Sequence, residues 1–509
     1  TTNTLIGGLA GDALTTGTAN VAVGYGTLSA EDAHGHNVAV GYHALVAQNA
    51  GADAYNVAVG SNAGKAVTTG TYNTLVGGLA GDAITSGNTN VALGYQALTS
   101  ETQGDRNVAI GVSALEVQNN TSNVDVYNVA VGYHAGKSVT TATNNVIVGG
   151  LAGDSLTTGS YNTALGFGAL GSEDAHGRNV AIGYLALTTQ DAGADAYNVA
   201  VGFNSGTSVT TGIYNTLVGG LSGDALTIGN SNVAVGYAAL TSEVQGDRNV
   251  AVGVAALQSQ SNSSDVDAYN VAVGYYAGQS MTTGIENTLI GGQAGDAITE
   301  AKYNVAVGMN ALGTNILGWK NTAIGNNALG TMNPASAADT YNVGVGHNAG
   351  INVTTGVDNT ILGGLAGDAV TTGSYNVAVG RSALGSNTTA SSNISIGWTS
   401  LGACVEGGKN VGIGHQSLRN LNPSSASNTH NTAIGYHSGL NISTGTNNTI
   451  LGSEAGDALT TGSNNIVIGR SAAASAVDVS NEITLGDSNI SAIRAQVTSI
   501  SSLSDKRDK

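Results

Sequence analysis

The chain has 509 residues, including 76 glycines, two prolines and one cysteine, and its formal net charge at pH 7 is −18. The scarcity of proline, and the absence of glycine at every third position, exclude collagen. With 9% charged and 41% hydrophobic residues, the composition also differs from that of a disordered chain. The acidic excess argues against a general nucleic-acid binder or a protein that adsorbs to anionic membranes. Because Cys404 has no second cysteine to pair with, packing and hydrogen bonds must hold the fold.

A five-residue phrase, typified by Asn56-Val57-Ala58-Val59-Gly60, recurs 28 times between Asn3 and Glu482. Most copies begin as far after the previous copy as Asn20 lies after Asn3. A few begin farther on, as Asn56 does after Asn37 and Asn128 does after Asn107. One such unit cannot bury its apolar side alone, so neighbouring units must stack on one another. We therefore predict one repeat shaft over residues 1–486, shaped as a rod or fibre, with the longer intervals accommodated as loops.

Within each phrase, two branched apolar residues alternate with a small residue, which is the period of a short strand. The glycine permits a turn, and a second segment such as Tyr42-His43-Ala44-Leu45 follows. We predict two strands of about four or five residues per coil, stacked in parallel at about 4.8 Å. The recurring asparagine fits a hydrogen-bonded ladder that also caps a turn. The fold class is therefore all-β, a parallel β-solenoid or β-roll of about 28 coils.

A longer period overlies the coils. The segment from Gly7 to Ala13 returns, usually once in every four coils, with its aspartate at Asp82, Asp154, Asp224, Asp296, Asp368 and Asp457. This spacing indicates a duplicated block of four coils. We interpret the aspartate as a turn cap rather than a calcium ligand, because the repeats of calcium-binding nonapeptide proteins are far more closely spaced.

Ten tyrosines directly precede the asparagine of the phrase and eight directly follow its glycine. We expect them to pack at coil corners; a sugar-stacking surface is the alternative. His34 and His36 are the candidate metal ligands, but the equivalent loop reads His176-Gly177-Arg178, so an exposed loop is favoured and no metal or cofactor is expected. Residues 1–486 contain no distinctive set of catalytic side chains, and we predict that the shaft is not an enzyme.

The repeat stops after residue 486. Ile490, Ile493, Val497, Ile500 and Leu503 follow at spacings of 3, 4, 3 and 3, so residues 487–503 are predicted to form a neck or trimer junction, as either a helical seam or a twisted strand. No stretch is apolar over the roughly 18 residues of a membrane span. Because residue 1 is a threonine beside a repeat, we expect the chain to be a fragment or a cleaved product.

The last six residues, Ser504-Asp505-Lys506-Arg507-Asp508-Lys509, resemble the start of the intramolecular chaperone domain (peptidase S74) of phage tail fibres and endosialidases. The resemblance implies that residues 504–509 begin a cleavable C-terminal domain that assembles three chains and then removes itself. Ser504 would be the nucleophile, Lys509 its activating base, and the Ser504-Asp505 bond the scissile bond. A nearby lysine with a lowered pKa can serve as base for a serine hydroxyl.

Repeats such as Asn431-Thr432-Ala433-Ile434-Gly435-Tyr436 are similar to those of fibre proteins that carry this chaperone, and more weakly to trimeric autotransporter adhesin heads. The resemblance implies a homotrimeric phage tail fibre shaft, made in the host cytoplasm and carried on the virion. Its expected partners are other copies of itself, other tail proteins and a bacterial surface receptor, either a glycan or an outer-membrane component. A bacterial trimeric surface adhesin is the alternative. An ice- or mineral-binding solenoid ranks last, because the Thr-Thr pairs occur only at some coils.

Overall fold

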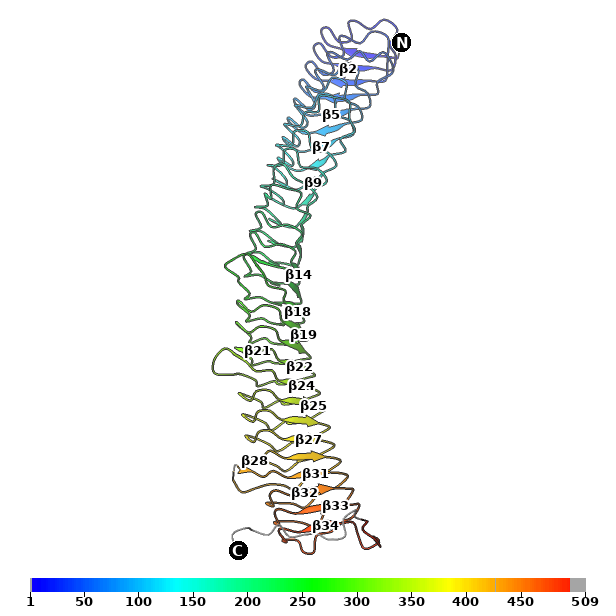
Figure 1. Cartoon of the computed structure of the whole chain (residues 1–509). Coiled ribbons are helices and arrows are strands. Elements are labelled where there is room, and N and C mark those ends of the chain that lie inside the picture. The colour runs from blue at the N-terminus through cyan, green and yellow to red at the C-terminus, as the bar shows by residue number, and fades with distance from the viewer. Residues whose placement is uncertain (1, 426, 495–509) are drawn as a thin grey trace. The chain divides into compact units, whose positions relative to one another are not determined.

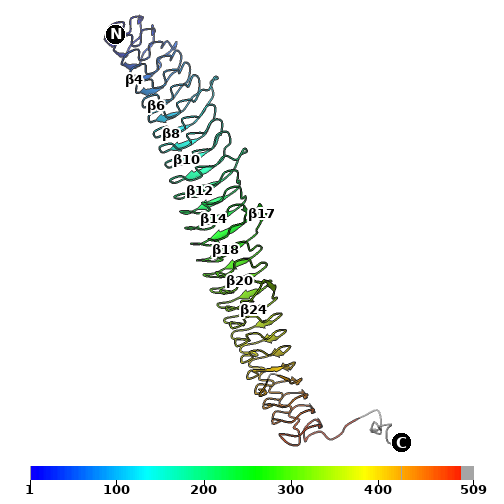
Figure 2. The ribbon, with the colours of Figure 1, turned by 90° about the vertical axis from the view of Figure 1, so that its left-hand side faces the viewer.

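The computed structural model describes residues 2–425 and 427–494, and the chain divides into two compact units, Thr1–Met309 and Asn310–Lys509. The described residues form an all-β parallel solenoid of 28 coils, each with one three-residue strand. This confirms the predicted fold class and coil number. In each unit the strands follow one another in chain order along one side of the coils (Figures 1 and 2).

The coil strands of the first unit are β1 (Thr4–Ile6), β2 (Val21–Val23), β3 (Val38–Val40), β4 (Val57–Val59), β5 (Thr74–Val76), β6 (Val91–Leu93), β7 (Val108–Ile110), β8 (Val129–Val131), β9 (Val146–Val148), β10 (Thr163–Leu165), β11 (Val180–Ile182), β12 (Val199–Val201), β13 (Thr216–Val218), β14 (Val233–Val235), β16 (Val250–Val252), β18 (Val271–Val273), β19 (Thr288–Ile290) and β20 (Val305–Val307). Those of the second unit are β22 (Thr322–Ile324), β24 (Val343–Val345), β25 (Thr360–Leu362), β26 (Val377–Val379), β27 (Ile394–Ile396), β29 (Val411–Ile413), β31 (Thr432–Ile434), β32 (Thr449–Leu451), β33 (Ile466–Ile468) and β34 (Ile483–Leu485).

The parallel register is the same in the short coils and in the longer ones. Thr4 pairs with Val21 across a short coil, while Val38 pairs with Val57, and Val108 with Val129, across longer coils. The extra residues therefore lie outside the coil strands, as predicted. Some of them form pairs of two-residue strands: β15 (Gly246–Asp247) with β17 (Val266–Asp267), β21 (Gly318–Trp319) with β23 (Ala338–Asp339), and β28 (Gly407–Gly408) with β30 (Ser427–Asn428). Strands β21 and β28 lie on the side of the coil away from β22 and β31 (Figure 1).

The prediction of a second strand in every coil is wrong. The segment Tyr42-His43-Ala44-Leu45, proposed as that strand, is a turn. His43 and Leu45 have φ angles of 55° and 47°, with Ala44 between them, so the backbone enters the left-handed region twice in three residues. A strand needs extended backbone at successive residues, and this alternation interrupts it.

The recurring asparagine makes hydrogen bonds both within its coil and to the neighbouring coils, and the predicted hydrogen-bonded ladder is confirmed. Asn198 is fully buried, and its backbone N–H donates to Oδ1 of Asn179 in the preceding coil, at 3.1 Å. Its own Oδ1 accepts the N–H of Asn215 in the next coil, at 2.8 Å, while its Nδ2 donates to the carbonyl of Gly212, at 2.7 Å. One side chain therefore joins a coil to its successor and closes the coil on itself.

The narrow core explains the four-coil block. The middle residue of most strands is a buried alanine, but the first coil of each block has leucine or isoleucine there, as at Leu75 and Leu217. Gly64 lies beside Leu75: a Cβ on Gly64 would be 2.7 Å from Leu75 Cδ1 and 2.9 Å from Leu45 Cδ2. Gly206 has the same relation to Leu217. A large core residue in one coil thus packs against a small residue in a neighbouring coil, at the density that protein interiors require.

The glycine that ends each strand lies against the backbone of the next coil. Gly202 has φ of +144°, and a Cβ there would be 2.4 Å from the carbonyl oxygen of Gly219. Gly193, in the loop before β12, also has positive φ, +67°, but a Cβ there would meet nothing within 4 Å. A side chain at Gly193 would therefore meet backbone strain alone, whereas one at Gly202 would meet a steric collision as well as a φ that is open mainly to glycine.

Gly202→Ala should therefore destabilise its coil more than Gly193→Ala does. Backbone strain should cost about 1–2 kcal/mol at Gly193, and the collision at Gly202, together with its less accessible φ, should add about 1–3 kcal/mol. Hydrogen exchange of the amides in β11, β12 and β13, measured for both variants, tests this difference, because a repeat protein can open locally. Equal loss of protection in the two variants would show that the close approach of the coils is unimportant.

Candidate functional site

The catalytic pair predicted at the C-terminal end, Ser504 and Lys509, lies outside the described residues, as does the Ser504-Asp505 bond. Of the predicted neck, residues 487–494 are described, and they form no regular strand or helix. Ile490 and Ile493 are 55% and 72% exposed. More than half of each of these apolar side chains is therefore left uncovered within the single chain.

The main surface feature of the described residues is the outer face of the coil strands. Side chains in a strand alternate between its two faces, and here the middle residue points inward while the first and third point outward. In β12, Ala200 is buried between the partly exposed Val199 and Val201, and in β33, Ile466 and Ile468 flank the buried Val467. Branched and other apolar side chains recur at the outward positions of nearly every coil. Both units therefore carry an apolar sheet face, here called the sheet face.

Exposed aromatic residues flank many of the coil strands in sequence. Phe167, Tyr184 and Phe203 occupy the position after the glycine in successive coils, and their ring centroids are 5.7 and 5.4 Å apart with nearly parallel planes. Before the asparagine, Tyr197 and Tyr214 stack at 5.7 Å. Aromatic rings of successive coils therefore stack on one another. About half of each of these side chains is still exposed, so the rings also present flat apolar surface to solvent.

The longer coils carry a repeated cluster of a cation, an aspartate and a tyrosine. A basic residue ending one coil pairs with an aspartate of the next: Arg106 with Asp125, Arg178 with Asp195, Arg248 with Asp267, and Lys320 with Asp339. The same cations lie 5.0 to 5.6 Å from the ring centroids of Tyr127, Tyr197, Tyr269 and Tyr341. Hydrogen bonding to Lys320 lowers the pKa of Asp339. Each cluster ties an extended loop to the preceding coil.

The two histidines considered as metal ligands have different surroundings. His36 stacks on Tyr55, with ring centroids 4.8 Å apart, and its Nε2 is 3.6 Å from Asp53 Oδ2. It therefore occupies the place that arginine or lysine takes in the clusters above. His34 instead lies over the buried Glu31, with Nδ1 3.5 Å from Glu31 Oε1. Among the described residues, the groups that could hold a cation include His34 but not His36.

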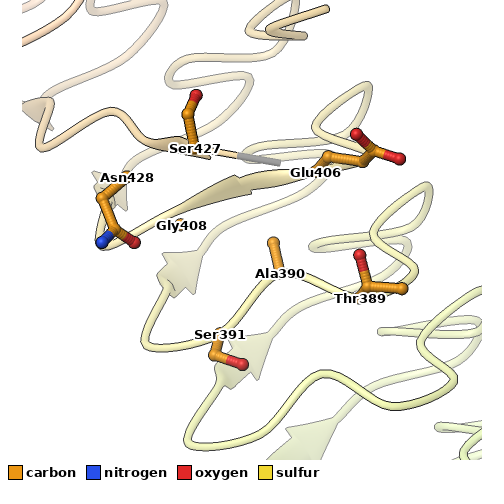
Figure 3. A pocket seen from close by; sticks show the side chains of 7 residues that line it. All are labelled: Thr389, Ala390, Ser391, Glu406, Gly408, Ser427 and Asn428. Atoms are coloured by element: carbon orange, nitrogen blue, oxygen red, sulfur yellow. The ribbon is translucent and has the colours of Figure 1, made fainter. Parts of the chain in front are cut away.

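Two shallow hollows lie in the second unit. One, of about 260 Å³, is lined by small or polar residues from three successive coils: Thr389, Ala390, Ser391, Glu406, Gly408, Ser427 and Asn428 (Figure 3). The other, of about 370 Å³, includes Asp368, Thr399 and Arg419. Neither lining contains a histidine or cysteine that could activate, or act as, a nucleophile.

Comparisons with known proteins add no family assignment. No protein-family model matches the chain, and no curated protein matches it in sequence. The part of the chain that the structure describes contains no helix long and apolar enough to cross a membrane.

Cys404 should be chemically inert in the folded chain. It is fully buried, its Sγ donates to the carbonyl of Gly407 at 3.3 Å, and burial raises the pKa of its thiol to about 11. Because the thiolate is the reactive form, we expect no reaction with a thiol reagent at pH 8 until the chain is denatured. Mass spectrometry after timed labelling, with and without denaturant, measures this. Rapid labelling without denaturant would contradict the burial of Cys404.

Proposed function

We propose that this chain is the shaft of a homotrimeric phage tail fibre that mediates attachment to a bacterial host. In this proposal the shaft is a structural protein of the virion. Its partners are two further copies of the chain, other tail proteins and a receptor on the bacterial surface, and a self-cleaving C-terminal chaperone assembles the trimer.

The sheet face is the observation that carries the proposal. Single exposed apolar residues are common on monomeric proteins, but here they recur at matched positions. Val146, Leu165 and Ile290 are 43%, 43% and 39% exposed at the outward positions of their strands. Contiguous apolar surface larger than a few hundred Å² marks an interaction site. An identical chain offers the same spacing of apolar rows, so identical copies arranged around a common axis could cover one another's faces.

The choice of a phage fibre over a bacterial surface adhesin rests on the resemblance of residues 504–509 to the chaperone start, because the sheet face fits both. An ice- or mineral-binding function is less favoured. Threonine hydroxyls in one column are already engaged between coils: Thr68 Oγ1 donates to Thr85 O, and Thr85 Oγ1 to Thr102 O.

The first test concerns assembly. Lysine at Val59, Val148, Val201 and Val273 would place charges on the sheet face of four coils, each at an outward strand position. The matched control has lysine at Thr69, Thr158, Thr211 and Thr283, which are exposed residues of the same four coils outside the strands. Buried unpaired charge is costly, so the valine variant should dissociate while the threonine variant stays trimeric.

Sedimentation velocity and chemical cross-linking measure the outcome. A monomeric unsubstituted chain would contradict the trimer. Trimers of equal stability in both variants would instead show that the sheet face is not the surface of assembly.

A second test concerns processing. In a precursor that carries the complete chaperone, Ser504→Ala should abolish cleavage of the Ser504-Asp505 bond, because the nucleophile is lost. Lys509→Met should slow it strongly, because the base is lost. Lys506→Met is the matched control, since it removes a nearby lysine with no assigned role, and it should leave cleavage unchanged. Normal processing of both the Ser504 and Lys509 variants, measured by mass spectrometry, would refute the site assignment.

A further inference from the structure

A buried glutamate recurs in the second coil of four successive blocks, as Glu31, Glu101, Glu173 and Glu243, and each is fully buried. Two of them are well satisfied. Glu101 Oε1 accepts four backbone N–H groups, including that of Gly104 at 2.8 Å, and its Oε2 accepts Gln118 Nε2 and Asn120 Nδ2 at 2.8 and 3.0 Å. Glu243, two blocks later, accepts the equivalent four backbone N–H groups, together with Asn262 Nδ2 at 2.9 Å. Amide donors replace the water that these carboxylates lose.

The other two glutamates lack this set of donors. Glu173 Oε1 accepts the N–H of His176 at 3.1 Å, but its Oε2 has no hydrogen-bond partner. Nδ1 of His176 lies 3.8 Å from Glu173 Oε1 and also has no hydrogen-bond partner. A fully buried carboxylate oxygen without a partner is costly. A positively charged group or a hydrogen-bond donor beside Glu173 Oε2 would therefore stabilise the site.

Two further carboxylates surround this buried group. Asp174 follows Glu173 in the same loop, and Asp191 comes from the next coil. Ligand atoms of Glu173, Asp174, His176 and Asp191 all lie within 4.8 Å of one another. Three carboxylates with one imidazole leave an excess of negative charge at this point.

We propose that Glu173, Asp174, His176 and Asp191 form a binding site for a divalent first-row transition metal ion such as Zn²⁺. Imidazole is a preferred ligand of these ions, and Zn²⁺ also binds the carboxylate oxygens of Asp and Glu. At metal–ligand distances of about 2.0–2.2 Å, the ligand atoms of a tetrahedral ion lie about 3.4 Å apart. Ligand atoms of this group that lie near the 4.8 Å limit would therefore have to approach one another by about 1.4 Å when the ion binds. The ion would neutralise the buried Glu173 and link its loop to the next coil through Asp191.

The chain contains a natural variant of the same site. Glu31, Asp32 and His34 repeat the first three ligands, with ligand atoms again within 4.8 Å of one another, and Glu31 Oε2 also lacks a partner. Asn49 stands at the position of Asp191, since both follow their glutamate at the same separation in sequence. A neutral amide is a weaker ligand than a carboxylate, so this second site should bind the same ion less tightly.

Equilibrium dialysis of the full chain with Zn²⁺, together with visible absorption on titration with Co²⁺, tests the proposal. We expect two sites per chain, one tighter than the other. His176→Ala should remove the tighter site and His34→Ala the weaker one. Asp191→Asn should weaken the tighter site about tenfold or more, toward the affinity of the weaker one. Asp265→Asn, which removes one charge from an exposed aspartate elsewhere, should change neither site.

Glu173→Gln guards against loss of folding as the explanation, because it keeps the size of the buried side chain. It should retain the circular dichroism spectrum of the unsubstituted chain yet lose the tighter site. Unchanged Zn²⁺ binding by the His34→Ala/His176→Ala double variant would overturn the proposal, since the ions would then be held by scattered surface carboxylates. Retained tight binding by Glu173→Gln would also overturn it. These outcomes do not depend on whether the chain forms a trimer.

Discussion

The hydrogen bonding of one buried asparagine per coil is the constraint on which the rest of the structure depends. A coil with a single three-residue strand has few backbone pairs to hold it, and most of its backbone is turn. An amide side chain has both an acceptor and donors. At Asn56 the acceptor takes the N–H of Asn73 at 2.8 Å, while the donor reaches Gly70 O at 2.8 Å. Stacking and coil closure therefore depend on the same side chain.

The ladder changes at Glu482, which stands in the asparagine position of the last coil. Its backbone N–H still donates to Asn465 Oδ1, at 3.0 Å. Its carboxylate, however, accepts hydrogen bonds from Ser475 and Thr484, and these bonds lower the pKa of Glu482. A carboxylate has no donor with which to close the coil as the asparagine amide does. The backbone of Glu482 therefore keeps its place in the ladder through the bond to Asn465, but its side chain does not repeat the hydrogen bonds that asparagine makes in the earlier coils.

Much of the fold could be predicted from the sequence because it follows from strict periodicity. The regular spacing of the phrase determines the strand register, and the longer intervals leave that register intact. The second strand was wrongly predicted, because Tyr42-His43-Ala44-Leu45 has the composition of a strand while its φ angles are set by the tight path of the coil. Left-handed conformations at non-glycine residues such as Leu45 have no clear compositional signal.

The candidate sites were predicted less completely. The His34-Gly35-His36 motif drew attention to two residues with different surroundings, whereas the group that could hold a cation combines His34 with Glu31 and Asp32. Sequence comparison between blocks could have found it: the third residue after the glutamate is histidine in two blocks, His34 and His176, and glycine in the other two, Gly104 and Gly246. That Oε2 of Glu173 has no hydrogen-bond partner follows only from the structure, in which Glu173 is buried. The alternation predicted a short strand, but the outward direction of its branched residues, and the lack of a layer that covers them, required the structure.

The packing of a large core residue against a small one in the neighbouring coil also acts against errors of register during folding. Repeats of near-identical sequence can pair with the wrong neighbour, and a chain with many equivalent pairings has a rugged energy landscape. If pairing skipped one coil, Leu75 would face a neighbour other than Gly64, and bulky side chains would compete for a space that fits only one of them. A slip by a whole block keeps the sizes matched, but it requires all four coils of that block to loop out. Within a four-coil block, the coils therefore differ in the size of their core residues, and this difference favours pairing with the correct coil.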